Sequence, residues 1–296
     1  MRVNPDNSLN LISSLSGLQQ QENELLAQMA SGRRLAKPSD DPAAAGSLVD
    51  VISQSAQVDT FTQNSSSLNS AMQLADSTLA SVVTALQRAA TLGINAANGT
   101  LSDSDRAAVV QELEGIRDQV LSLSNTSSQG TFLFAGTASV DKPFVLDPAS
   151  PAGVTYLGNT ETNLLEISNG YHIQTGVPGN DLFLNPSGSV FKTLTDLINA
   201  VQSNSGIGEG STAVSQARAL LSAQRVFYGN AMNQLNANTT VLQNESTQLS
   251  NRENSLAAAD LAKVTTQLVS LQTGMNAVLS AASKTMGTSL FDYLNF

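Results

Sequence analysis

The sequence predicts a mainly α-helical protein with a β insertion, in which a long antiparallel coiled-coil rod carries a small outer β domain. Two long stretches, residues 43–142 and 187–296, lack proline, which disrupts helix interiors. Apolar residues recur in both stretches at the 3.5-residue spacing of coiled coils. Aromatic residues instead gather between residues 130 and 191, where we expect them to form a core of their own.

Composition excludes several classes of function. The 296 residues include 14 basic and 24 acidic side chains, for a net charge of −10, whereas nucleic-acid binding requires a basic face. The absence of cysteine removes thiol catalysis, disulfides and thiolate metal sites, and the single histidine, His172, cannot build a histidine metal site alone. No apolar run is long enough to span a membrane, and the first residues lack the apolar core of a secretory signal. We therefore expect no nucleic-acid binding and no membrane insertion.

The first arm opens with a thin apolar stripe that has coiled-coil spacing and one interruption, at Glu22. Its members are Leu11, Leu15, Leu18, Leu25 and Met29. A longer stripe of the same kind runs from Phe61 to Ala89. A third, over residues 109–123, follows Ser102 and Asp105, whose spacing is that of a capping box at a helix start. We expect helices along all three stripes.

A charged linker separates the first two stripes. Its charged residues are Arg33, Arg34, Lys37, Asp40 and Asp41. The two adjacent acids followed by Pro42 predict a helix N-cap with proline at the first helical position, where its missing N–H costs nothing. We favour this interpretation over a catalytic acidic pair, and we favour local pairing of the basic residues over a partner-binding patch.

The middle of the chain alternates short β-rich segments with Gly, Asn and Pro turns. Strands are predicted at residues 131–134, 154–157, 164–167 and 171–174, and the Ser-Asn-Gly segment at 168–170 is typical of a hairpin turn. An amphipathic helix is predicted next, over residues 190–203. The order of helices, then strands, then helices favours a β insertion on a helical bundle.

The second arm holds the longest stripe, in which an apolar residue recurs every seven positions from Val214 to Leu256. The phase then slips, and the stripe continues with Leu261, Val264, Leu268, Leu271, Met275 and Val278. At about 1.5 Å per residue, residues 211–285 would form a rod on the order of 110 Å long. We therefore expect an elongated molecule.

The stripes at the two chain ends, residues 8–30 and 257–285, are thin and flanked by Ser, Gln and Asn. Two such helices bury little surface against one another, so we expect them to complete their burial against other copies, as an assembly seam. The expected domains are a terminal helical core of residues 1–37 with 258–296, a long-helix rod of residues 38–129 with 205–257, and a small β-rich outer domain of residues 130–204.

No catalytic constellation is visible in the sequence. The motifs of serine hydrolases, P-loop proteins, dinucleotide-binding proteins and zinc proteases are absent. Ser139 with Lys142 and Ser189 with Lys192 have Ser-x-x-Lys spacing, but the chain is rich in serine and the companion motifs are missing. His172 is interpreted as a structural residue of a strand. We expect no enzyme activity, no cofactor and no metal.

Two linker segments, ASGRRL at residues 30–35 and PSDDPA at residues 38–43, resemble the segment that joins the first two helices in the flagellin superfamily. Leu86-Gln87-Arg88 with the segment 95–100 is similar to a helix-end motif of that superfamily, and residues 259–262 are similar to its C-terminal pattern. The resemblance therefore covers both arms.

Within this superfamily, the middle of the chain is similar to the family that joins hook to filament. The similarity is carried by GTFLFAGT at residues 130–137 with Pro143-Phe144, by the segments 156–159 and 178–183, and by the chain end at 289–294. Phe132 departs from the pattern, which often has Tyr there. Thr91 stands where flagellins have an acidic residue, so their innate-receptor motif is only partly kept.

The resemblance implies a structural protein of the bacterial flagellum, located outside the cell and exported through the flagellar type III apparatus without a cleaved signal peptide. It implies self-assembly as a ring between the first hook–filament junction protein and flagellin, as the base on which flagellin assembles, and contact with an export chaperone. Two alternatives stay open: a flagellin filament subunit with a small outer domain, and a glycan-binding β domain on a coiled-coil stalk. Ligand binding by an isolated fragment of residues 128–205 would support the last, and we expect none.

Overall fold

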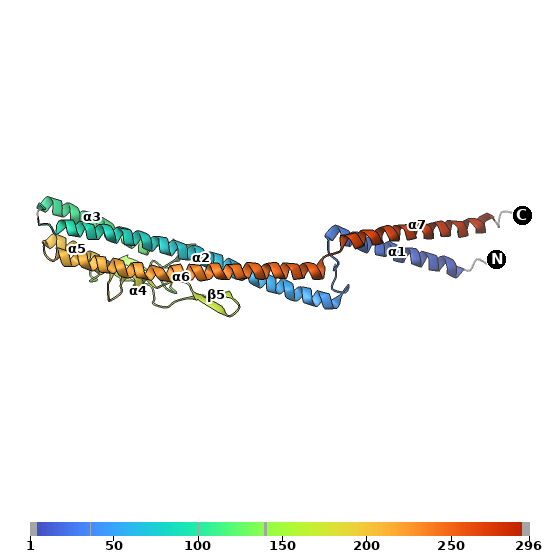
Figure 1. Ribbon diagram of the computed structural model, residues 1–296, viewed down its shortest axis with the longest axis horizontal. Helices are drawn as coiled ribbons and strands as arrows, with labels where there is room; N and C mark the ends of the chain where they lie inside the picture. Colours follow the sequence, from blue (N-terminus) through green and yellow to red (C-terminus); the bar gives the residue numbers. More distant parts are fainter. Residues whose placement is uncertain (1–4, 36, 100, 139–140, 292–296) are drawn as a thin grey trace. The chain divides into compact units, whose positions relative to one another are not determined.

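Long helices account for most of the chain, as the proline-free stripes predict. The computed structural model describes residues 5–35, 37–99, 101–138 and 141–291, and for residues 5–11, 282 and 284–291 it describes the backbone alone (Figure 1). The helices are α1 (Pro5–Ser31), α2 (Pro42–Ala96), α3 (Asp103–Ser124), α4 (Gly179–Phe183), α5 (Val190–Ser203), α6 (Ile207–Ala257) and α7 (Leu261–Phe291). The predicted fold class, mainly α with a β insertion, is confirmed.

The chain divides into two compact units. The first holds Met1–Gln57 with Glu245–Phe296, and the second holds Val58–Asn244. α1 and α7 belong to the first unit, and α3, α4, α5 and the strands belong to the second, whereas α2 and α6 contribute residues to both. The division into a terminal core, a rod and an outer β domain stays a prediction.

In the second unit, α2 and α6 bury the faces that carry the apolar stripes. The buried side chains include Met72, Leu79, Val82 and Leu86 of α2 and Val214, Leu221, Tyr228 and Leu235 of α6. Arg225 of α6 also forms two hydrogen bonds with Asp76 of α2, from Nε to Oδ1 at 2.7 Å and from Nη2 to Oδ2 at 2.9 Å. The two long helices are therefore joined by apolar contacts and by one bidentate ion pair.

The exposed faces of these helices are polar but carry little charge. Many of their hydroxyl groups donate to the carbonyl oxygen four residues back, as at Ser81, Thr84 and Thr212. Such bonds satisfy the hydroxyl within the helix itself. The helices can therefore remain polar outside although only 13% of the residues are charged.

Capping side chains set two of the helix starts as predicted. Asp41 Oδ1 accepts a hydrogen bond of 3.1 Å from Ala44 N, and α2 begins at Pro42. Asp105 N donates to Ser102 Oγ at 3.2 Å while Ser102 N donates to Asp105 Oδ2 at 3.3 Å. This reciprocal pair confirms the capping box at the start of α3.

The second arm is not one continuous helix, so the predicted single rod over residues 211–285 is wrong. α6 ends at Ala257 and α7 begins at Leu261. Asp260 Oδ1 accepts a hydrogen bond of 3.1 Å from Lys263 N at the start of α7, and Ala259 N donates to the Gly32 carbonyl oxygen instead of continuing α6. The break coincides with the phase slip of the apolar stripe, because a new helix starts a new phase.

The strands form three antiparallel pairs: β1 (Ser127–Ser128) with β2 (Thr131–Phe132), β3 (Phe144–Leu146) with β4 (Val154–Tyr156), and β5 (Leu164–Ser168) with β6 (Tyr171–Gln174). The predicted strands correspond to β2, β4, β5 and β6, and the predicted helix at residues 190–203 is α5. β1 and β3 were not predicted, because β1 consists of serine and β3 lies between two prolines.

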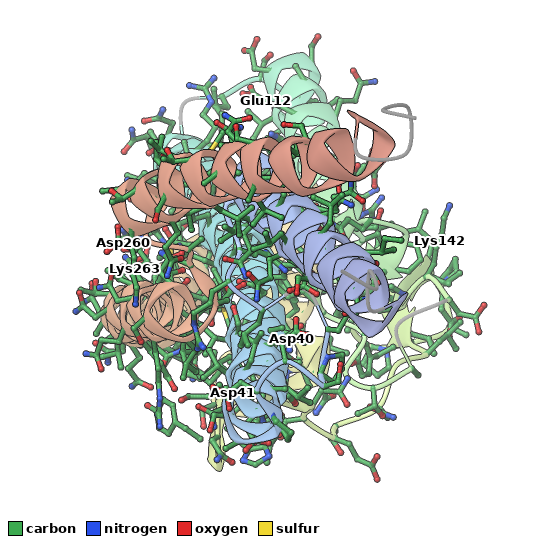
Figure 2. All side chains as sticks on the ribbon, turned by 90° about the vertical axis from the view of Figure 1, so that its right-hand side faces the viewer. Asp40, Asp41, Glu112, Lys142, Asp260 and Lys263 are labelled. Atoms are coloured by element: carbon green, nitrogen blue, oxygen red, sulfur yellow. The ribbon has the colours of Figure 1, made fainter. Side chains whose placement is uncertain are left out.

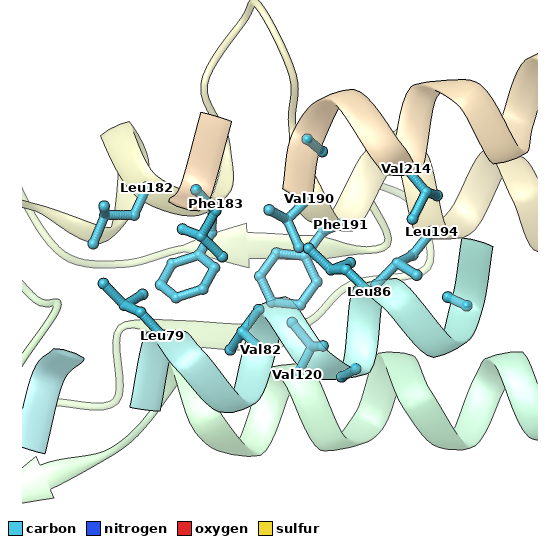
Figure 3. Close-up of a cluster of buried hydrophobic side chains, with 14 of the residues drawn as sticks. Leu79, Val82, Leu86, Val120, Leu182, Phe183, Val190, Phe191, Leu194 and Val214 are labelled. Atoms are coloured by element: carbon cyan, nitrogen blue, oxygen red, sulfur yellow. The ribbon is translucent and has the colours of Figure 1, made fainter. Parts of the chain in front are cut away.

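The aromatic side chains of the middle region do not form a core of their own, so that expectation is wrong. Phe134, Phe144, Phe183 and Phe191 are buried and contact one another, with ring centroids 5.4 to 6.0 Å apart. They belong to one apolar cluster with the helices, and Figure 3 shows Phe183 and Phe191 packed among side chains of α2, α3, α5 and α6. Strand pairs this short bury too little surface to fold alone.

None of the helices, over the residues that the structure describes, has both the length and the apolar character needed to cross a bilayer.

Candidate assembly site: the linker bridge and the α1–α7 pair

The connection between α1 and α2 lies beside the connection between α6 and α7, and backbone hydrogen bonds join them. Arg34 N donates to Ala257 O at 2.7 Å, and Ala259 N donates to Gly32 O at 2.9 Å. Gly32 has φ +67°, the left-handed conformation that glycine favours at the end of a helix, here α1. We call this backbone contact the linker bridge.

The Arg34 side chain extends the linker bridge to two helix ends. Its Nη2 donates to Leu256 O near the end of α6 at 2.9 Å, and its Nη1 donates to Asp41 Oδ2 at 3.4 Å. The Ala44 backbone N–H and then the Arg34 guanidinium hold the pKa of the Asp41 carboxyl below its usual value. Arg34 therefore links the C-terminal end of α6, where a cation is favourable, to the N-cap of α2.

The other charged linker residues also find partners nearby. Arg33 Nη2 lies 3.6 Å from Glu253 Oε1 of α6, rather than beside the acids of its own linker. Asp40 Oδ2 accepts a hydrogen bond of 2.8 Å from Lys37 N. Figure 2 labels Asp40 and Asp41 of this connection. The predicted local pairing is thus present for Arg34 and Asp41, and the linker motif acts as a structural joint.

The apolar stripes of the two chain ends face each other within one chain. Val264 and Leu268 of α7 are buried, and the partly buried stripe residues are Leu15, Leu18 and Leu25 of α1 and Leu271, Met275 and Val278 of α7. Glu22, which interrupts the first stripe, is paired here, because Gln272 Nε2 donates to its Oε1 at 3.4 Å. Met29 and Leu261 are exposed.

Part of the stripe that was expected to complete its burial against other copies is therefore already covered within the chain. Leu268 is only 8% exposed, because α1 of the same chain already covers it. Besides Met29 and Leu261 of the stripes, the described side chains of the pair include four exposed large apolar ones that lie off the stripes, Ile12, Leu26, Val269 and Leu279, which we call the outer apolar residues. The pair also carries a hollow of about 530 Å³ that Leu18, Leu25 and Leu271 line together with Glu24 and with glutamine, serine and glycine residues.

The outer apolar residues were missed because they lie off the heptad positions. The sequence pattern that could have identified them is the presence of large apolar residues outside the stripe positions, on helices that already carry a stripe. Leu11 and Ser139, which the sequence also singled out, lie outside the described side chains, as does the chain end at 289–294.

The family-like segments of the middle region converge on one tightly packed point. Tyr156 Oη lies 2.9 Å from both the Phe134 and the Asn159 carbonyl oxygens, and burial raises the pKa of its phenol. Gly179 N donates to Phe134 O at 2.8 Å. A Cβ on Gly179 would lie 2.6 Å from that oxygen, and one on Gly158 would lie 2.5 Å from the Tyr156 ring. The glycines are therefore required by close backbone approach.

Of the residues that the structure describes, those considered above as possible catalytic groups have structural roles or lie without catalytic partners in this fold. Ser189 caps α5 by accepting a hydrogen bond from Lys192 N at 3.3 Å, and Lys192 Nζ pairs with Asp196 at 2.6 Å. His172 is exposed on β6, opposite Glu166 of β5. Among the described residues, no group of three His, Asp or Glu side chains is placed to hold a metal ion.

Comparisons with known proteins point in one direction. Residues 6–139 match the family model of the bacterial flagellin N-terminal helical region. Flagellar hook-associated protein 3 of Escherichia coli strain K12 is 34% identical over 53% of this chain and 48% of that protein, and its Salmonella typhimurium counterpart is 37% identical over 45% and 42%. The chain thus spans about half the length of these curated relatives. Flagellin of Listeria monocytogenes is 25% identical over 87% of both chains.

Solved structures share the fold. A structure described as a flagellar hook-associated protein from Vibrio parahaemolyticus has a TM-score of 0.67 at 19% identity and covers 74% of this chain and 100% of its own. Bacillus cereus FlgL has a TM-score of 0.59 at 23% identity over 69% and 99%. At these identities the likeness concerns the fold alone.

Proposed function

We propose that the chain is a member of the flagellin superfamily and a structural protein of the bacterial flagellum, which polymerises as the junction between hook and filament; the match of residues 6–139 to the flagellin N-terminal helical region supports this. In this role it is the base on which flagellin assembles, and it works by contact rather than by catalysis. The observation that carries the proposal is the identity of 34 and 37% with hook-associated protein 3 of two bacteria, over 53 and 45% of this chain.

The α1–α7 pair supports a polymerising role. Its outer apolar residues stay exposed although the heptad seam is closed within the chain. Exposed apolar side chains of this size can take part in interaction surfaces. The outer apolar residues and the adjoining hollow are the surface that we assign to contacts with further copies.

The proposed partners follow from this place in the flagellum. Copies of the chain form a ring, with the first hook–filament junction protein on one side and flagellin on the other, after export with the help of a flagellar chaperone. The proposed location is extracellular, on the flagellum, reached without a cleaved signal peptide.

A second candidate function is a flagellin filament subunit with a small outer region. It is favoured by the alignment with Listeria monocytogenes flagellin, which extends over 87% of both chains.

Deletion of the gene from its own bacterium separates the two candidates. Loss of a junction protein leaves hooks without filaments and releases intact flagellin into the medium. Loss of a filament subunit leaves hooks that still carry the junction proteins and removes this chain from the filament fraction. Filaments of normal length in the deletion strain would contradict both.

A further inference from the structure

We propose that the second unit carries a binding site for a neutral saccharide, in a cavity between α2 and the β1–β2 hairpin. The cavity has a volume of about 500 Å³, within the size range of small-molecule sites, roughly 300–1,000 Å³. Leu68 of α2, with Leu133 and Val177 of the middle region, gives it an apolar floor. This site is independent of the assembly surface described above.

The polar lining selects the class of ligand. Gln129, Glu161 and Asn163 contribute amide and carboxylate groups, which can donate to or accept from the paired hydroxyls of a sugar. Phe132, half-buried, is the aromatic residue among those that line the cavity, and an aromatic ring can pack against the C–H face of a sugar. No Lys or Arg lines the cavity, and the chain carries a net charge of −10, so anionic ligands are disfavoured.

Gln129 supplies a second, independent observation. It has φ +52° and is followed by Gly130 at φ +82°, so both central residues of the β1–β2 turn are left-handed. Such two-residue turns prefer Asn or Asp before the glycine, because short polar side chains tolerate this conformation best. The other described non-glycine residue at positive φ, Asn204, is accounted for as the C-cap of α5.

The hairpin thus keeps a long amide at a strained position where its side chain lines the cavity. Strained backbone of this kind concentrates at ligand-binding sites. The walls on either side are held by backbone hydrogen bonds, from Leu133 N to Thr126 O at 3.1 Å and from Thr175 N to Asn163 O at 2.9 Å. The cavity is therefore formed before any ligand enters.

The site needs both α2 and the middle region. Ser67, Leu68 and Ala71 of α2 form one wall, and an isolated fragment of residues 128–205 lacks all three. Such a fragment is therefore not expected to bind, and the test requires the full chain.

The test is saturation-transfer NMR on the full chain with maltose, cellobiose and chitobiose, and with glucuronate as an anionic comparator. We expect transfer to at least one neutral disaccharide and none to glucuronate. Gln129→Ala and Phe132→Ala should each weaken that binding by roughly threefold to tenfold, the effect of one lost hydrogen bond or ring contact. Leu157→Ala, an exposed apolar residue outside the cavity, is the matched control and should leave binding unchanged.

Gln129→Asn gives the sharper signature. It suits the turn but shortens the amide, so it should raise the melting temperature while it weakens saccharide binding. Absence of transfer to every neutral disaccharide, equal binding of glucuronate, or unchanged binding in all three cavity variants would each overturn the proposal. A fourth result would also overturn it: a Phe132→Ala variant that still binds saccharide but no longer assembles into a ring. That result would indicate that a neighbouring protein chain, and not a sugar, occupies the cavity beside Phe132.

Discussion

Arg34 Nη2 donates a hydrogen bond of 2.9 Å to the carbonyl oxygen of Leu256, 222 residues further along the chain. The last carbonyl groups of a helix lack partners within it and carry partial negative charge. The positively charged guanidinium therefore provides a hydrogen-bond donor to a carbonyl group near the end of α6. The same side chain also pairs with the Asp41 cap of α2, so it adds a side-chain link to the backbone hydrogen bonds that join the two connections.

Replacing Arg34 by Ala should loosen the linker bridge while leaving the second unit intact. The backbone amides of Arg34 and Ala259 should exchange with deuterium roughly threefold to tenfold faster, as expected for one hydrogen bond lost. Arg34→Lys should not restore protection, because an ammonium lacks the planar fork that reaches two acceptors. Hydrogen exchange with mass spectrometry provides the measurement.

Arg33→Ala is the control for this prediction. Its Nη2 lies 3.6 Å from Glu253 Oε1, and the two side chains are 59% and 34% exposed; ion pairs this open to solvent contribute little. If Arg33→Ala and Arg34→Ala accelerate exchange equally, general charge rather than the bond to Leu256 holds the linker bridge.

The Asp41 cap should make the first unit sensitive to acid. The folded-state pKa of Asp41 is lowered from 3.8, so its stabilising effect is fully present above that value and is lost as pH falls through the lowered folded pKa. In Asp41→Asn, which keeps an oxygen acceptor for the cap, this component of the acid dependence should disappear. Helix content followed by circular dichroism between pH 6 and pH 2 tests it; identical acid profiles for the variant and the native chain would contradict it.

Two neighbouring residues of α7 separate pairing within the chain from assembly between chains. Leu268 is 8% exposed and Val269 is 58% exposed. Leu268→Asp should open the α1–α7 pair, because a buried leucine contributes roughly 2–5 kcal/mol and a carboxylate replaces it, and limited proteolysis of the monomer should then remove both helices. Val269→Asp should leave the monomer resistant but abolish junction assembly, with flagellin lost to the medium.

Leu235→Asp, at a fully buried position of α6 in the second unit, is the comparison variant for Leu268→Asp and Val269→Asp. It should lower the main melting transition, which neither α7 variant is expected to move. Normal assembly of the Val269→Asp protein would show that the outer apolar residues are not the contact surface.

The shared core predicts that the middle region cannot be removed without consequence. Phe183 lies in ring contact with Phe134, Phe144 and Phe191 and packs beside Leu79 (Figure 3). Phe183→Ala should therefore lower the free energy of unfolding by roughly 3–5 kcal/mol, measured by urea denaturation. Deletion of residues 138–186 should destabilise α2 and α6 as well. An unchanged unfolding transition in either variant would contradict the shared core and would support the hypothesis of an independent β domain.

Much of the helical framework could be predicted because its signals are local. The cap formed by Asp41 and Pro42, the capping box of Ser102 and Asp105, and the helix at residues 190–203 each depend on hydrogen bonds or side chains within a few positions of one another. Periodicity likewise identified the buried faces of α2 and α6. The phase slip after Leu256 marked the start of α7, although a continuous rod was expected there.

The sequence by itself determined which residues face inward, and only the tertiary structure decided what they face. A heptad stripe reports a buried face but not its partner, so Leu268 was assigned to another copy although α1 covers it. The aromatic residues were grouped by sequence position, but short strand pairs bury too little surface, and the rings complete a core made with α2, α3 and α6. Contacts such as Arg34 with Leu256, or Leu68 with Gln129 around one cavity, join residues distant in the chain. No local pattern records them, because they form only when whole helices pack.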